Sequence, residues 1–130
     1  MRKSIFLPKL FLTTAYCIFI FYMLIRSQPI STPDVPQFDK VLHAGSYFVM
    51  ALLLMWTFSS SDFSKKAVLY ITIIIAFCHG IVGETMHYFL PYRDWEIMDM
   101  ASNIFGGFAG AMTFLYFKKF MMRRRLQRAC

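Results

Sequence analysis

Four long apolar runs constrain the fold of this chain more than any other feature. They cover about 5–25, 41–58, 67–89 and 97–117, and each reaches or approaches the roughly 17–25 residues that a helix needs to cross a bilayer. Because 58% of the residues are hydrophobic and only 16% are charged, one soluble core could not cover so much apolar surface. The helices of a soluble bundle would also need polar faces, which these runs lack. The sequence therefore predicts an all-α, polytopic membrane protein with four transmembrane helices.

The basic residues predict how these helices are oriented. Most of them flank the first run, follow the second or form the C-terminal tail: Arg2, Lys3, Lys9, Lys65, Lys66, Lys118, Lys119, Arg123, Arg124, Arg125 and Arg128. By the positive-inside rule, both termini are expected in the cytoplasm, with the loops 26–40 and 90–96 outside. We expect a single domain over residues 1–130, folded as a four-helix up-down bundle. The first helix should be retained, because no small-x-small cleavage site follows it.

The net charge of +7 mostly reflects this bias. A basic tail next to a membrane span predicts contact with anionic lipid rather than with nucleic acid. Cys17, Cys78 and Cys130 are scattered and form no CxxC motif, so they indicate neither a disulfide framework nor a zinc knuckle. The sequence predicts no cofactor, and it leaves the oligomeric state open.

Polar residues of three runs should converge at the predicted outer end of the bundle. They are Asp39, Lys40 and His43 before and in the second run, Glu84 and His87 in the third, and Asp99 and Asn103 in the fourth. Within each run, these residues are three or four positions apart and therefore share a helix face. Ionisable groups at such depth are costly toward lipid, so they should face one another in the interior. We predict a polar pocket that opens outward.

Two glycines extend this pattern along the fourth run. Gly106 and Gly110 continue the face that carries Asp99 and Asn103. A small-xxx-small pair lets two helix backbones approach closely, so a neighbouring helix is expected to pack there.

The spacing of these residues resembles the VanZ-like family, small bacterial membrane proteins named for a teicoplanin-resistance determinant. The resemblance is carried by DKVLH at 39–43, E-x-x-H-x-x-x-P-x-R at 84–93 and D-x-x-x-N-x-x-G-x-x-x-G at 99–110. His87 stands where the family usually has Gln, and Glu96 stands where a small hydroxyl residue is common. The resemblance implies a multi-pass protein of the bacterial inner (plasma) membrane. It would bind or handle an envelope-facing amphiphile, a membrane lipid or lipid-linked envelope precursor, and affect susceptibility to lipoglycopeptide antibiotics.

Three functions remain open for the same residues. A binding protein would hold a polar or anionic head group among Asp39, Lys40, His43, Glu84, His87, Arg93, Asp99 and Asn103, with the chain of the ligand along the glycine-rich groove. Arg93 and Lys40 would grip the anion, Arg93 through its bidentate fork. An intramembrane enzyme would use His43, Glu84 and Asp99 for acid–base chemistry, although no G-x-S-x-G nucleophile motif is present. A non-catalytic membrane scaffold is the third alternative.

A metal site is a weaker hypothesis for the same end of the bundle. His43, Glu84 and His87 could hold Zn²⁺ with one open position, whereas a di-iron bundle would need a second Glu-x-x-His motif, which is absent. His79 lies near the middle of the third run, and we expect it to make an interhelical hydrogen bond rather than to ligate a metal.

Overall fold

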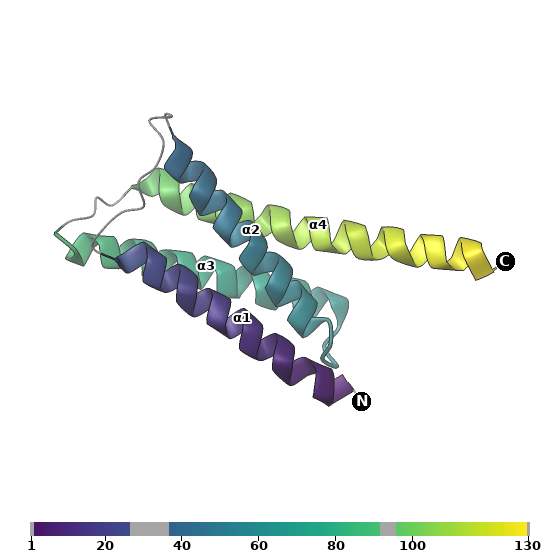
Figure 1. Ribbon diagram of the computed structural model, residues 1–130. Coiled ribbons are helices and arrows are strands. Elements are labelled where there is room, and N and C mark those ends of the chain that lie inside the picture. The colour runs from purple at the N-terminus through teal and green to yellow at the C-terminus, as the bar shows by residue number, and fades with distance from the viewer. Residues whose placement is uncertain (1, 27–36, 92–95, 130) are drawn as a thin grey trace.

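The computed structural model describes residues 2–26, 37–91 and 96–129, which form four helices and no strand. The helices are α1 (Arg2–Ile25), α2 (Phe38–Phe58), α3 (Lys65–Phe89) and α4 (Ile97–Ala129). Successive helices run in alternating directions, so the ends of α1 and α3 gather with the starts of α2 and α4 (Figure 1). The predicted all-α class is confirmed.

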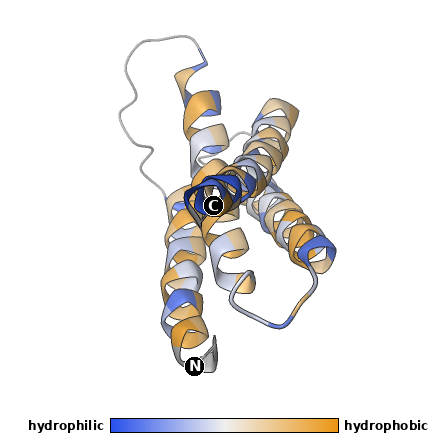
Figure 2. Cartoon of the chain, turned by 90° about the vertical axis from the view of Figure 1, so that its right-hand side faces the viewer, coloured by the Kyte–Doolittle hydropathy of each residue, from blue (hydrophilic) through white to orange (hydrophobic). Residues whose placement is uncertain are grey.

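The outer surface of the bundle is apolar. Within the part of the chain that the structure describes, three helices are long and apolar enough to cross a membrane, at Ile5–Ile25, Phe38–Phe58 and Lys65–Phe89. Figure 2 shows hydrophobic residues along all four helices and a hydrophilic stretch at the C-terminal end of α4. Exposed aromatic side chains such as Phe11 and Phe105 would be unfavourable in water but suit a lipid environment. The molecule is therefore compatible with a multi-pass membrane protein.

The helix ends follow local signals in the sequence. The side chain of Ser64 caps α3 by accepting a hydrogen bond from the backbone N–H of Ala67 at 3.2 Å. At the other end of α3, Leu90 is extended (φ −102°, ψ 116°), as expected for a residue before Pro91. The fourth helix continues to Ala129 instead of ending near 117. Its tail consists of good helix formers, with no glycine or proline after Gly110.

The closest packing in the bundle is that of α2 against α4, at the two predicted glycines. A Cβ atom on Gly106 would lie 2.7 Å from the carbonyl carbon of Ala44, and one on Gly110 would lie 3.0 Å from that of Phe48. Both contacts involve the backbone of α2, which a side chain cannot displace without moving the helix. The glycine stripe is thus covered by α2, and it does not form the open groove for a ligand chain that the sequence suggested.

A hydrogen-bonded chain across α1, α2 and α3 lies near the middle of the bundle. The hydroxyl group of Tyr47, which is fully buried, is 2.9 Å from Nδ1 of His79, and Nε2 of His79 is 3.1 Å from the carbonyl oxygen of Cys17. Because a carbonyl only accepts, Nε2 carries the hydrogen, and Nδ1 of a neutral ring accepts from Tyr47. The sequence predicted an interhelical hydrogen bond for His79, and two are present.

Candidate functional site

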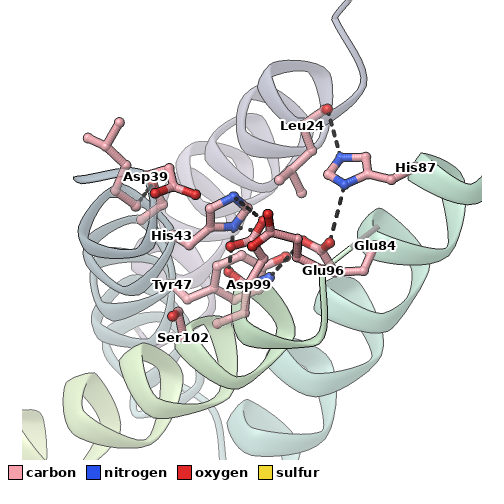
Figure 3. A network of polar contacts seen from close by, with 12 residues as sticks. Leu24, Asp39, His43, Tyr47, Glu84, His87, Glu96, Asp99 and Ser102 are labelled. Carbon is pink, nitrogen blue, oxygen red and sulfur yellow. Dashed lines mark hydrogen bonds and ion pairs between the residues drawn. The ribbon is translucent and has the colours of Figure 1, made fainter. Parts of the chain in front are cut away.

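A polar cluster lies where α2 and α4 begin and where α3 ends (Figure 3). Its members are Asp39, Lys40, His43, Glu84, His87, Glu96, Asp99 and Asn103, joined by hydrogen bonds and ion pairs. All predicted ligand-binding residues that the structure describes belong to this polar cluster. The remaining predicted residue, Arg93, lies outside the described residues.

Lys40 lies among three carboxylates of the polar cluster. Its Nζ atom is 2.8 Å from Oδ2 of Asp39 and 2.7 Å from Oδ1 of Asp99, and it also contacts the carboxylate of Glu96. The three acids lie close enough together to hold a metal ion, but here Lys40 supplies the positive charge. An ammonium group has three hydrogens, so each carboxylate can accept one. To grip an external anion, as the sequence predicted, Lys40 would have to exchange one of these partners.

His43 is linked to Glu84 through an amide. The Nδ1 atom of His43 lies 3.0 Å from Oδ1 of Asn103, and Nδ2 of Asn103 donates to Oε1 of Glu84 at 3.4 Å. Since the amide nitrogen is the donor to Glu84, the amide oxygen accepts from Nδ1–H of His43. His43 thus reaches Glu84 only through Asn103 and makes no direct hydrogen bond to Glu84 or Asp99. The nearest His43–carboxylate distances are 3.8 Å and 3.7 Å, beyond hydrogen-bond range.

The other oxygen of Glu84 faces a second histidine. Nδ1 of His87 lies 3.2 Å from Oε2 of Glu84, and Nε2 of His87 lies 3.0 Å from the carbonyl oxygen of Leu24 in α1. Nε2 must donate to this carbonyl, so a neutral ring would turn its Nδ1 lone pair toward the carboxylate. Such a contact is favourable only if one of the two groups carries an additional proton. Neither Oε2 of Glu84 nor Nδ1 of His87 has a hydrogen-bond partner among the described residues, so the two atoms meet as a buried ion-pair contact.

Burial divides the polar cluster into a floor and a rim. Glu84 and Asn103 are each 1% exposed, and they form the floor together with His87. The side chains of Asp39 and Glu96 are 49% and 52% exposed, and they form the rim. A ligand that approaches the end of the bundle would thus meet carboxylates first and the buried hydrogen-bonding groups afterwards.

The charge of the polar cluster is negative. Four carboxyl groups face one lysine and two imidazoles: Asp39, Glu84, Glu96 and Asp99 against Lys40, His43 and His87. Even with both imidazoles protonated, the formal charge of these described residues stays negative. A bound group with a positive charge or several hydrogen-bond donors would complement it.

Three possible metal ligands from three helices also come together. One donor atom each from His43, Glu84 and Asp99 lie within 4.8 Å of one another. An imidazole and two carboxylates would suit zinc or another divalent first-row ion. This group differs from the set expected from the sequence because Asp99 takes the place of His87. The Nε2 atom of His87 is turned toward α1 and donates to Leu24.

An apolar groove of about 450 Å³ lies between α3 and α4. It is lined by Ile73, Ala76, Phe77, Ala101, Ile104, Phe105, Gly107 and Phe108. Gly107 allows the close approach there, since a Cβ atom on it would lie 3.3 Å from that of Ala76. Ala101 and Ile104 are within one helical turn of Asn103, so the groove begins near the floor of the polar cluster.

Two members of the network had no specific signal in the sequence. The carbonyl oxygen of Leu24 joins α1 to the polar cluster, but every residue carries a carbonyl group and nothing singles this one out. Glu96 was not among the residues predicted to bind a ligand, and the structure places its carboxylate against Lys40. Its closeness to Asp99 in the sequence was the only hint.

Comparison with known proteins gives one relative and no functional assignment. The chain is 33% identical over 96 residues to an uncharacterized protein of Schizosaccharomyces pombe. The match covers 72% of this chain and 57% of the relative, so the chain spans little more than half of the relative's length. No protein-family model matches the chain, and no solved structure matches it.

Proposed function

We propose that this chain is a VanZ-like integral membrane protein that binds the head group of an envelope-facing amphiphile in the polar cluster. The observation that carries the proposal is the burial of Glu84, His87 and Asn103 in one network of hydrogen bonds and ion pairs at the end of an apolar bundle. Burying a carboxyl group in such a position is expensive. A ligand that uses these groups would account for their presence.

The proposal includes a fourth transmembrane helix in α4. Asp99, Ser102 and Asn103 lower the hydropathy of its first half, but Asp99 and Asn103 are buried inside the bundle. The residues that face outward there include Ile104, Phe105 and Phe108, which suit lipid. With four spans, the charge distribution supports cytoplasmic termini in the inner (plasma) membrane and a polar cluster that faces outward.

The ligand would place its head group at the rim and its chain in the α3–α4 groove. Since Lys40 is engaged by carboxylates and the described charges sum to a negative value, an amine- or hydroxyl-bearing head group fits better than a bare anion. The groove beside Gly107 is lined by apolar side chains, as expected for a hydrocarbon chain. A link to teicoplanin susceptibility, which the family resemblance implies, would follow if the bound amphiphile is this lipoglycopeptide or a precursor that it recognises.

Ligand retention by purified variants tests this proposal. Wild-type protein in detergent would be titrated with phosphatidylethanolamine or teicoplanin, and bound molecules would be measured by native mass spectrometry, which also records any metal. Glu84→Ala should weaken retention at least about tenfold, which corresponds to 1.4 kcal/mol. The control is Thr85→Ala, since Thr85 is exposed and bonds only to the Ile81 carbonyl oxygen in its own helix.

The outcome of this titration separates the alternatives. Membrane insertion of Glu84→Ala should be normal, because removing a buried carboxyl group also removes its desolvation cost. Unchanged retention and unchanged teicoplanin susceptibility in Glu84→Ala would refute the binding function and favour the scaffold.

An intramembrane acid–base enzyme is the second candidate, favoured by the buried carboxyl group of Glu84 and imidazole of His87, which face each other at 3.2 Å. Such a pair can accept or deliver a proton inside a site that excludes water. In this case, incubation with lipid would yield a product detectable by mass spectrometry. Glu84→Gln would abolish turnover while retaining the ligand, because the amide keeps the hydrogen bonds but cannot transfer the proton.

A further inference from the structure

A second groove, distinct from the polar cluster, lies at the opposite end of the bundle. It has a volume of about 520 Å³ and is formed by the N-terminal part of α1, the C-terminal end of α2 and the second half of α4. Three cationic residues line it, namely Lys9, Lys118 and Arg125. We call it the basic groove. Residues of α4 that line the basic groove recur every three or four positions from Phe114 to Arg125 and so share one helix face.

The cation contributed by α1 is held in place by α2. Nζ of Lys9 donates a hydrogen bond to Oγ of Ser60 at 2.7 Å, and it lies 4.4 Å from the centroid of the Trp56 ring. A cation over the face of an indole is attracted by the ring electrons. Lys118 lies over Phe114 at 5.9 Å in the same manner. The ammonium groups of Lys9 and Lys118 are thus each oriented by an aromatic ring that also lines the basic groove.

The charge of the basic groove is unbalanced. Among the described residues that line it there is no carboxylate. Bringing three positive groups to one cavity costs free energy unless an anion joins them. The rest of the lining is largely apolar, with Trp56, Phe117 and Met121 among its members. An anion attached to a hydrocarbon chain would satisfy both parts of the surface.

We propose that the basic groove binds one anionic phospholipid of the membrane leaflet at that end of the bundle. The head-group phosphate would contact Lys9, Lys118 and Arg125, and the first part of an acyl chain would lie on Trp56 and Phe117. Basic pockets between transmembrane helices are known to bind anionic head groups in this way. The bound lipid would fasten α4 to α1 and α2 at a point where α4 extends beyond the other helices (Figure 1). The proposal is independent of the function of the polar cluster and of which leaflet is involved.

The test compares two double variants with the same change in net charge. Lys118→Gln with Arg125→Gln alters the basic groove, whereas Lys119→Gln with Arg123→Gln alters the other face of the same helix, outside the groove lining. The purified full chain in detergent is titrated with dioleoylphosphatidylglycerol or dioleoylphosphatidylcholine, and retained lipid is counted by native mass spectrometry. Thermal melting of each variant checks that the fold is intact.

Wild type and the Lys119/Arg123 variant should each retain one phosphatidylglycerol and no phosphatidylcholine. The Lys118/Arg125 variant should bind phosphatidylglycerol at least about tenfold more weakly, and Lys9→Gln should weaken binding in the same direction although it lies on α1. Equal losses in the two double variants would overturn the proposal, since they would show attraction to the whole basic tail. Equal retention of the two lipids by the wild type would overturn it as well.

Discussion

The imidazole of His87 and the carboxyl group of Glu84 face each other across 3.2 Å inside the bundle, one turn apart on α3. The opposite nitrogen of the ring is committed to the carbonyl oxygen of Leu24 at 3.0 Å. The pair therefore connects α1 to Asn103 and through it to His43. A substitution of His87 should therefore affect the contacts of all of these partners.

Replacement of His87 tests this connection. His87→Leu leaves the Leu24 carbonyl without its side-chain donor and Oε2 of Glu84 without its ion-pair partner, which should cost about 1–3 kcal/mol of unfolding free energy. His87→Gln should cost less, because its amide can donate to one of these oxygens. Unfolding of the detergent-solubilised variants in SDS measures both values. Equal stability of the Leu variant and the wild type would contradict the hydrogen-bonding role.

Removal of Lys40 should be more harmful than removal of any single acid around it. Lys40→Met leaves Asp39, Glu96 and Asp99 close together without a cation. We expect a loss of about 1–3 kcal/mol, below that of a fully buried pair, because Asp39 and Glu96 are half-exposed. In the double variant Lys40→Met with Asp99→Asn, part of the lost unfolding free energy should be recovered, because one of the unpaired carboxylates is removed. If the free-energy changes of the two substitutions simply add, the ion pair between Lys40 and Asp99 does not contribute to stability.

The two glycines Gly106 and Gly45 should respond differently to alanine. A Cβ atom on Gly106 meets the Ala44 carbonyl group of α2, so Gly106→Ala should force α2 and α4 apart and destabilise by about 1–3 kcal/mol. Nothing lies within 4 Å of the corresponding position at Gly45. Gly45→Ala should therefore be neutral, or stabilising by up to about 1 kcal/mol, because alanine is the better helix former. Melting temperatures in detergent compare the two, and a stable Gly106→Ala would refute the close contact.

Loss of the Tyr47 hydroxyl group should weaken the link between α2 and α3. Tyr47→Phe leaves Nδ1 of His79 without its donor at 2.9 Å, which should cost about 1 kcal/mol. Tyr70→Phe is the control, since Tyr70 is exposed on the outside of α3. SDS unfolding should separate the two variants. If both behave like the wild type, the Tyr47–His79 bond contributes nothing to stability.

The proposed orientation has a direct measurement. The basic flanks predict that a reporter fused after Lys119 is cytoplasmic and that reporters inserted within 27–38 are extracytoplasmic. Fusions to alkaline phosphatase and to a fluorescent protein, compared at the same position, show on which side of the membrane that position lies. A cytoplasmic signal from the 27–38 fusions would place the polar cluster on the inner side and reject an envelope-facing ligand.

Much of the architecture could be predicted from the sequence, because hydropathy and helix periodicity are local properties. The apolar runs determined the four helices, Ser64 and Pro91 determined the limits of α3, and the spacing of Glu84 and His87 determined that they share a face. Their position near helix ends also determined that Glu84, Asp99 and Asn103 would meet at the same end of an alternating bundle. The main local error was the end of α4, whose basic tail remains helical although it is not apolar.

The partners of these residues were decided only by the tertiary structure. Whether His43 bonds to Asn103 or Glu84 depends on how far each helix is rotated about its axis and on the angle at which α2 crosses α4. Gly106 fixes that crossing by admitting the backbone of Ala44, and the same contact brings Lys40 to Asp99. Rotation and crossing angle result from packing of all four helices at once. No single stretch of sequence contains them, which is why the sequence determined the composition of the polar cluster and the tertiary structure determined its bonds.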